Sequence, residues 1–229
     1  MVKYEIFGGN LPAVTLHLEA GQGIYMQSGG LSWMTSDIAM ETNMKGGGLK
    51  ALGRVFTGAS LFMATYTAQS NGQHITLGSS FPGSILALDV AQGPYVCQKN
   101  SFLCAEHDVT LGVYTPLGIK AGLFGGEGFL MQELAGNGMV FVEIDGSLLE
   151  VDLKPGEKLK VSTGNIAVFE KKVKYSVETV KGFKNIFFGG EGLFLTTVEG
   201  PGKVWLQSMT MSGFVTRISP YLPDKSNKS

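Results

Sequence analysis

Residues 124–130 read Phe-Gly-Gly-Glu-Gly-Phe-Leu, residues 188–194 read Phe-Gly-Gly-Glu-Gly-Leu-Phe, and residues 56–62 read Phe-Thr-Gly-Ala-Ser-Leu-Phe. Successive segments start 124 − 56 = 68 and 188 − 124 = 64 residues apart. A phrase that returns at such a period indicates one supersecondary unit used three times along the chain. We therefore expect the leading phenylalanines to hold equivalent core positions in three related units. These residues are Phe56, Phe124 and Phe188.

The similarity extends to both sides of the repeated phrase. Upstream of it, each copy has a glycine, an apolar residue and a lysine, and the lysines are Lys50, Lys120 and Lys184. Each unit also opens with an apolar segment and a turn, and closes with a second apolar pair joined by a glycine turn. These landmarks predict unit one at residues 1–78, unit two at 79–146, unit three at 147–215 and a tail at 216–229.

Short alternating segments predict that the units are built from β-strands. Side chains alternate with period two in residues 204–209 and 175–179, and most apolar runs are short, β-branched or aromatic and bounded by turn residues. Glycine accounts for 33 of 229 residues, about twice its ordinary usage of roughly 7%. The fold class is therefore predicted as all-β, with one helical stretch at 211–218 and a loose end after residue 223.

Composition limits the classes of partner. Charged residues make up 16% of the chain and the net charge is −1, so no general attraction to nucleic-acid backbones is expected. Low charge with many apolar strands suggests that extra surface is buried between subunits. The N-terminus has no signal-peptide core and no apolar run is long enough to span a membrane. We expect a cytoplasmic protein without a membrane-spanning helix.

Cys97, Cys104 and His107 form the one cluster with the residue types of a metal site. A zinc site would need a fourth ligand and usually has closer cysteines, and both cysteines lie in apolar strands. We interpret them as free, buried, small apolar side chains. His17 and His74 are the remaining histidines, and neither has a recognisable nucleophile beside it. No catalytic residue, metal or cofactor is predicted.

The glycine clusters do not match a phosphate-binding loop in spacing, so tight turns between strands explain them better. Glu127 and Glu191 recur within these turns, whereas Ala59 stands in the same place in the first unit. We interpret the two glutamates as turn carboxylates. Lys50, Lys120 and Lys184 recur in all three units. They are either solvated lysines or a band of like charge that faces an anionic ligand or lipid head group.

An ordered set of segments resembles the mitochondrial-biogenesis (altered inheritance of mitochondria) family over residues 1–215, together with its bacterial and archaeal members. The segments are 81–85 (Phe-Pro-Gly-Ser-Ile), 100–105 (Asn-Ser-Phe-Leu-Cys-Ala), 124–128, 188–194 and 200–208 (Gly-Pro-Gly-Lys-Val-Trp-Leu-Gln-Ser). The resemblance implies three tandem short double-stranded β-helix units of jelly-roll type. Each is similar to the unit of the tryptophan-binding RNA attenuation protein. It also implies a homotrimer whose nine units close a pseudo-ninefold ring.

The resemblance supplies no catalytic residue. Ala59 departs from the glutamate expected in the family pattern, and the lack of a mitochondrial presequence favours a prokaryotic cytosolic member. We therefore expect a non-enzymatic protein that forms a ring or binds a partner. Two alternatives stay open: binding of RNA or a small ligand by analogy with the attenuation protein, and an enzyme of unrecognised type.

Overall fold

The computed structural model describes residues 1–27, 29–42, 63–114, 131–179 and 194–222. These residues form nineteen strands and one α-helix, so the all-β prediction is confirmed. The strands in chain order are β1 (Lys3–Phe7), β2 (Ala13–Leu18), β3 (Gly23–Gln27), β4 (Leu31–Met34), β5 (Ile38–Thr42), β6 (Met63–Ala68), β7 (Gln73–Gly78), β8 (Gly83–Asp89), β9 (Tyr95–Gln98), β10 (Phe102–Glu106), β11 (Val109–Tyr114), β12 (Met131–Gly136), β13 (Met139–Asp145), β14 (Leu148–Leu153), β15 (Lys158–Ser162), β16 (Ile166–Glu170), β17 (Lys174–Thr179), β18 (Phe194–Glu199) and β19 (Gly202–Gln207).

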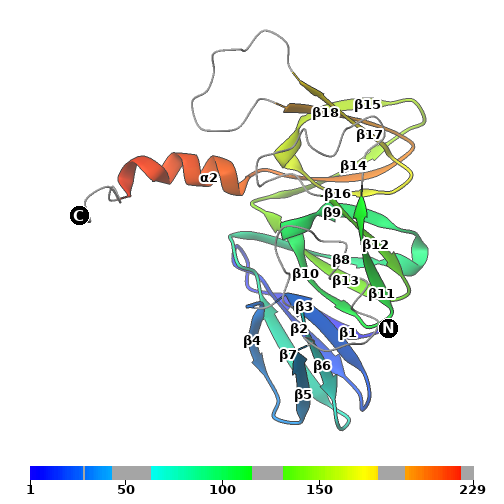
Figure 1. Ribbon diagram of the computed structural model, residues 1–229, viewed down its shortest axis with the longest axis vertical. Coiled ribbons are helices and arrows are strands. Elements are labelled where there is room, and N and C mark those ends of the chain that lie inside the picture. Colours follow the sequence, from blue (N-terminus) through cyan, green and yellow to red (C-terminus); the bar gives the residue numbers. More distant parts are fainter. Residues whose placement is uncertain (28, 43–62, 115–130, 180–193, 223–229) are drawn as a thin grey trace.

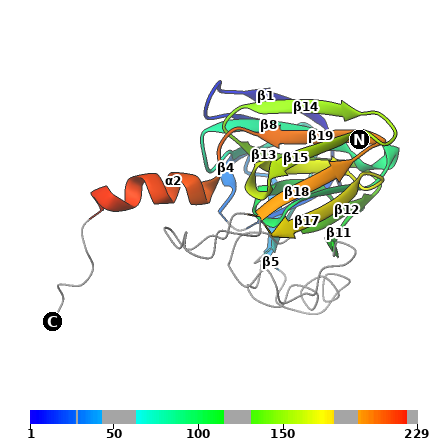
Figure 2. The same ribbon diagram turned by 90° about the horizontal axis from the view of Figure 1, so that it is seen from above.

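The strands form four antiparallel sheets, which we name A to D. Sheet A has the order β1-β2-β7-β4, sheet B β5-β6-β3-β10-β13-β8, sheet C β11-β12-β9-β16-β19-β14, and sheet D β15-β18-β17. Figure 1 shows the N-terminal strands at the bottom of the long axis and β15, β17 and β18 at the top. Figure 2 looks along that axis from the end at which sheet D lies.

Two kinds of three-strand block recur in these sheets. One block is β2-β7-β4, β8-β13-β10 and β14-β19-β16, and the other is β3-β6-β5, β9-β12-β11 and β15-β18-β17. Sheets B and C each join one block of each kind, because β10 pairs with β3 and β16 pairs with β9. The blocks at the two ends of the chain have no such neighbour among the described strands. Neighbouring segments of the chain are therefore joined by sheets to which both contribute strands.

A β-bulge recurs at the same place in each block of the first kind. The register shifts between Leu31 and Trp33, between Phe102 and Cys104, and between Ile166 and Val168. A bulge inserts one residue into one strand and bends it. Recurrence of the bulge gives a residue-by-residue correspondence between β4, β10 and β16. In it, Trp33 matches Cys104 and Val168.

A side-chain acceptor at the end of each bulged strand, or directly after it, binds a backbone N–H near the start of the middle strand of the block. The Glu106 carboxylate accepts the backbone N–H of Met139 at 2.7 Å, and the Glu170 carboxylate accepts that of Lys203 at 2.7 Å. In the first block the Thr35 hydroxyl accepts the N–H of His74 at 3.1 Å. Each acceptor satisfies a backbone donor at the strand end, where an unpaired group would cost free energy.

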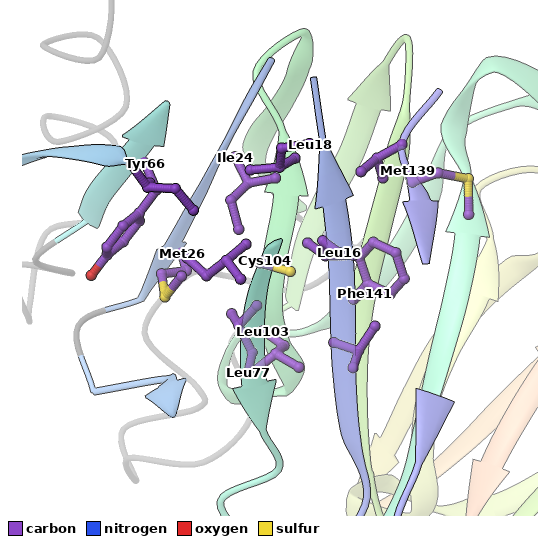
Figure 3. Packing of buried hydrophobic residues seen from close by; sticks show 14 of the residues in the cluster. Leu16, Leu18, Ile24, Met26, Tyr66, Leu77, Leu103, Cys104, Met139 and Phe141 are labelled. Atoms are coloured by element: carbon purple, nitrogen blue, oxygen red, sulfur yellow. The ribbon is translucent and has the colours of Figure 1, made fainter. Parts of the chain in front are cut away.

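Three apolar cores lie between successive sheets. The core between sheets A and B contains Leu16 and Leu77 from sheet A and Met26, Cys104 and Phe141 from sheet B. Figure 3 shows these side chains meeting between the strands. A second cluster lies between sheets B and C and a third between sheets C and D. The alternation of buried and less buried residues in β2 and β6 fits strands with one face turned to a core.

The α-helix of the described residues, α2, runs from Met211 to Ile218, as the sequence predicts. The Thr210 hydroxyl caps its first turn by accepting the N–H of Gly213 at 3.1 Å. The helix leads away from the sheets (Figure 1) and has no buried residue, although Phe214 contacts Phe81 edge to face at 4.9 Å. A 3-10 turn at Ser219–Tyr221 follows it.

Truncation of Phe141 to alanine tests the first core. Its side chain has no exposed surface, and the centroid of its ring lies 5.0 Å from that of the Tyr4 ring. We therefore expect the free energy of unfolding to fall by about 3–5 kcal/mol. Leu149, which is 59% exposed on β14, provides the control, since its change to alanine is expected to cost less than about 0.5 kcal/mol. Urea denaturation of both variants measures the difference. Equal losses would contradict the assigned core.

Candidate functional site

The repeated residues singled out from the sequence fall on parts of the chain that the structure does not describe. Outside the described residues lie the leading phenylalanines, the lysine band and the turn carboxylates, together with Ala59. They are Phe56, Phe124, Phe188, Lys50, Lys120, Lys184, Glu127 and Glu191. Their equivalence, and the anion-facing band of lysines, stay predictions.

Both cysteines are free and fully buried, as their interpretation as apolar side chains requires. Burial raises the pKa of the Cys97 thiol to about 12, although a hydrogen bond from Gln132 at 3.4 Å acts in the opposite direction. Burial also raises the pKa of the Cys104 thiol. Within the described ranges no group of three or more His, Cys, Asp or Glu residues could hold a metal ion. The absence of metal remains an expectation for the whole chain.

His17 and His74 lie opposite one another on β2 and β7, with ring centroids 6.5 Å apart. His74 also takes part in the strand-end contact, because its backbone N–H is the one that the Thr35 hydroxyl accepts. These contacts give both histidines places in the ladder of sheet A. In the part of the chain that the structure covers, no helix is long and apolar enough to cross a membrane.

The open edge of sheet A is the first half of a candidate assembly site. Among the described strands, β4 pairs with β7 alone, whereas its counterparts β10 and β16 pair on both sides. Exposure follows this difference: Trp33 is 53% exposed, while Cys104 and Val168 at the matching positions have no exposed surface. A large aromatic side chain therefore stands on an edge that is covered in the other two blocks.

The open edge of sheet D is the second half. Among the described strands β15 pairs only with β18, whereas its counterparts β3 and β9 each pair with two strands. Matching positions lie opposite the same place in the middle strand of each block. The pairs are Met26 with Ala64, Cys97 with Gln132, and Val161 with Thr196. Met26 and Cys97 are buried, but Val161 is only partly buried.

The two open edges are unlike each other and belong to opposite ends of the molecule (Figure 1). Inside the chain, the counterpart of one edge already pairs with the counterpart of the other, as β10 with β3 and β16 with β9. Exposed strand edges attract further strands because their backbone groups are unpaired. These features define an all-β protein of stacked antiparallel sheets that ends in two unlike edges, whose counterparts pair with each other inside the chain.

Comparison with known proteins agrees with this class. Residues 4–209 match the family model described as Mitochondrial biogenesis AIM24. The chain belongs to this family. A protein of Streptococcus pyogenes serotype M6, described as uncharacterized, is 27% identical over 224 residues, which is 94% of this chain and 89% of that protein.

A solved structure supports the fold. The X-ray crystal structure of another Streptococcus pyogenes protein superimposes with a TM-score of 0.78, at 23% sequence identity. The match covers 97% of this chain and 100% of that chain. At this identity the likeness speaks for the fold alone.

The sequence interpretation missed the open edges and the strand-end carboxylates. Glu106 and Glu170 are 170 − 106 = 64 residues apart, the same spacing as that between the two full copies of the glycine-rich phrase. That spacing was the available signal. Trp33 gave no comparable signal, because an aromatic residue in an apolar run is also what a buried strand would have.

The buried thiols lead to a test of reactivity. We expect neither cysteine to react with Ellman's reagent in the folded protein at pH 8, and two thiols per chain to react in denaturant. Because the folded pKa of Cys97 lies near 12, above the ordinary 9.0, the folded state keeps a proton that the unfolded chain releases. Stability should therefore fall as pH rises from about 9 to about 12. Rapid labelling of the folded protein would contradict this assignment.

Proposed function

We propose that this protein is a non-enzymatic assembly protein whose chains join head to tail, β4 of one copy to β15 of the next, into a closed homotrimeric ring. The observation that carries the proposal is the pairing of β10 with β3 and of β16 with β9 inside the chain. The same junction, formed once more between chains, would cover the edges of β4 and β15.

The internal junctions supply the register of the proposed contact. Cys104 lies opposite Met26, and Val168 lies opposite Cys97. By the strand correspondence, Trp33 would lie opposite Val161 of the next copy, and Thr35 opposite Leu159. The antiparallel direction is carried over as well. Trp33 and Val161 would then leave solvent together, which would bury two apolar side chains at each contact.

Closure follows from the type of contact. Two unlike patches make a heterologous interface, and such interfaces form a ring if the rotation closes and a fibre if it does not. A ring pairs both β4 and β15, whereas an open row of chains leaves one of these edges exposed at each end, and exposed edges promote aggregation. The family resemblance implies three copies, with the tandem double-stranded β-helix units of three chains giving nine positions around the ring.

The assembly proposal is favoured over the two alternatives. A chain of net charge −1 has no overall attraction for RNA phosphates, and the analogy with the attenuation protein rests on fold alone. For an enzyme, residues of matched pKa should converge in a cleft. The largest pKa changes here arise from burial of thiols and tyrosines in the cores. A cytoplasmic location belongs to the same proposal.

Replacement of Trp33 by aspartate tests the edge contact. We expect light scattering at micromolar concentration to give three times the chain mass of 24.4 kDa for the parent and the mass of one chain for Trp33→Asp. A carboxylate placed opposite Val161 would be desolvated without a partner. Leu149→Asp, on an exposed strand away from both edges, is expected to remain trimeric. A monomeric parent would sink the proposal.

Cross-linking tests the register itself. A variant with both Trp33→Cys and Val161→Cys should form disulfides between chains, because residues directly opposite in an antiparallel pair lie about 4.5–5.5 Å apart. A cysteine already holds the matching position at Cys104, so a small side chain is accommodated there. The control combines Met34→Cys with Val161→Cys, whose side chains would point to opposite faces. Ladders of equal strength in both would refute this register.

A further inference from the structure

A cavity of about 360 Å³ lies where the end of sheet A meets sheet B. It is lined by residues from the β3–β4, β7–β8 and β9–β10 connections and from the start of β10. Its lining includes Gln27, Gly30, Ser32, Ser80, Phe102 and Glu143. Phe102 is 2% exposed and offers the cavity a small apolar surface, whereas the glutamate, glutamine and serines make most of the lining polar. A concave site with a few fixed polar groups is a candidate for a small ligand.

Glu143 is the one charged residue that lines this cavity. One of its carboxylate oxygens, Oε2, accepts the backbone N–H of Ser80 at 2.8 Å and the Ser80 hydroxyl at 2.8 Å. The hydroxyl of Ser79 is 3.1 Å from the same oxygen. These contacts fix the carboxylate in one orientation. Among the described residues no cation pairs with Glu143 and no donor is assigned to its other oxygen, Oε1.

The first junction is the pairing of β3 with β10, and the second is the pairing of β9 with β16. At the second junction, glutamine holds the position that Glu143 has at the first. By the strand correspondence, Gln207 of β19 matches Glu143 of β13, and Asp145 matches Ser80. The Gln207 carbonyl oxygen accepts the N–H of Asp145 at 3.1 Å, as Glu143 does with Ser80. The Gln207 amide nitrogen then donates to the backbone oxygen of Gly164 at 2.8 Å. Gln207 is 5% exposed and closes its junction with this second bond.

A carboxylate cannot make that second bond, because it has no hydrogen to donate. Asn100 lines the cavity at the position that corresponds to Gly164. At the second junction, the Gln207 amide nitrogen bridges two chain segments. At the first junction, the corresponding atom is a carboxylate oxygen of Glu143, and the cavity lies beside it. Gln27 reaches across only weakly, with its amide nitrogen 3.5 Å from the backbone oxygen of Lys99. Among the described residues that line it, the first junction therefore has no positive charge, and no assigned donor reaches Glu143 Oε1.

We propose that this cavity is a binding site for a small organic cation, a primary amine with a short apolar body, anchored by Glu143. The ammonium group would supply the donors that Gln207 supplies at the other junction, and charge-assisted hydrogen bonds are the stronger kind. Its carbon chain would lie against Phe102 and Leu103. All the lining residues come from one chain, although Ser32 lies on β4, the strand that the proposed ring would pair with β15 of the next copy.

The cavity fits an amine better than a metal ion. Calcium takes 6–8 oxygen ligands and magnesium requires near-ideal octahedral geometry, whereas a single carboxylate lines this cavity. A bare ion also leaves most of a volume of about 360 Å³ unfilled. An anion is disfavoured because its charge would face that of Glu143.

Titration calorimetry with putrescine, n-butylamine, butanol and butyrate tests the site. We expect putrescine and n-butylamine to bind the parent, and butanol and butyrate not to bind. Glu143→Gln restores the donor that Gln207 provides and removes the charge, so it should weaken amine binding at least about tenfold. Glu5→Gln, on the exposed strand β1, is the matched control and should bind as the parent does.

A second variant keeps the test informative if Glu143→Gln is unstable. Gly30→Leu retains Glu143 and adds a bulky side chain at a residue that lines the cavity, where a Cβ would meet no atom closer than 3.6 Å, so it should narrow the cavity and weaken binding. Thermal unfolding and light scattering of each variant separate loss of the site from loss of fold or ring. The proposal is overturned if no amine binds at about 10 mM, if Glu143→Gln binds equally well, or if Mg²⁺ or Ca²⁺ alone displaces the amine.

Discussion

Pairing of strand edges is the constraint on which the rest of this structure depends. Each three-strand block has a side that needs a neighbour, since unpaired backbone groups at a sheet edge either meet water or recruit another strand. The chain satisfies four of these six sides internally, in the β3–β10 and β9–β16 junctions. Each junction consists of three pairs of opposed residues. The apolar cores on the two faces of the sheet cover these residues. A repeat of about 70 residues is marginal as a separate domain, so shared sheets and shared cores explain why the units occur in tandem.

The bulged strands show how the junctions are kept regular. The extra residue after Leu31, Phe102 and Ile166 bends each strand at the same point. Beyond the bulge, the side-chain acceptor of Thr35, Glu106 or Glu170 takes the backbone N–H that the ladder no longer serves. Glu106 does more than its counterparts, because its other oxygen accepts the N–H of Val2 at 2.8 Å. The first residues of the chain are thus held against the second block.

The sequence predicted the strand-rich class and the helix at 211–218, because alternation and turn residues are local signals. It did not predict which edges stay open. The sequences of β4 and β10 are both largely apolar. Trp33 differs from Cys104 because, among the described strands, none pairs with its strand on the second side. Strand pairing of this kind depends on residues that are far apart in the sequence. The candidate site depends on such properties. The repeated lysines and glutamates stand out through their spacing but lie outside the described residues, whereas the contacts at the strand ends and the cavity belong to Glu106, Glu143 and Glu170.

Glu143 and Gln207 are equivalent positions with different side chains, and this difference is the most specific indication of a binding function. Within one chain, Glu143 and Gln207 occupy the same place, differ by one oxygen for one nitrogen, and have matching first contacts to Ser80 and Asp145. The second contact then separates them: the amide closes its junction onto Gly164, and the carboxylate faces a cavity. Because the scaffold is common to both, the difference in chemistry is not a by-product of a different fold. A repeat whose junctions hold the blocks together can still change a single side chain at one of them. By our proposal the change affects what that junction binds, while the strand pairing that joins the blocks remains the same.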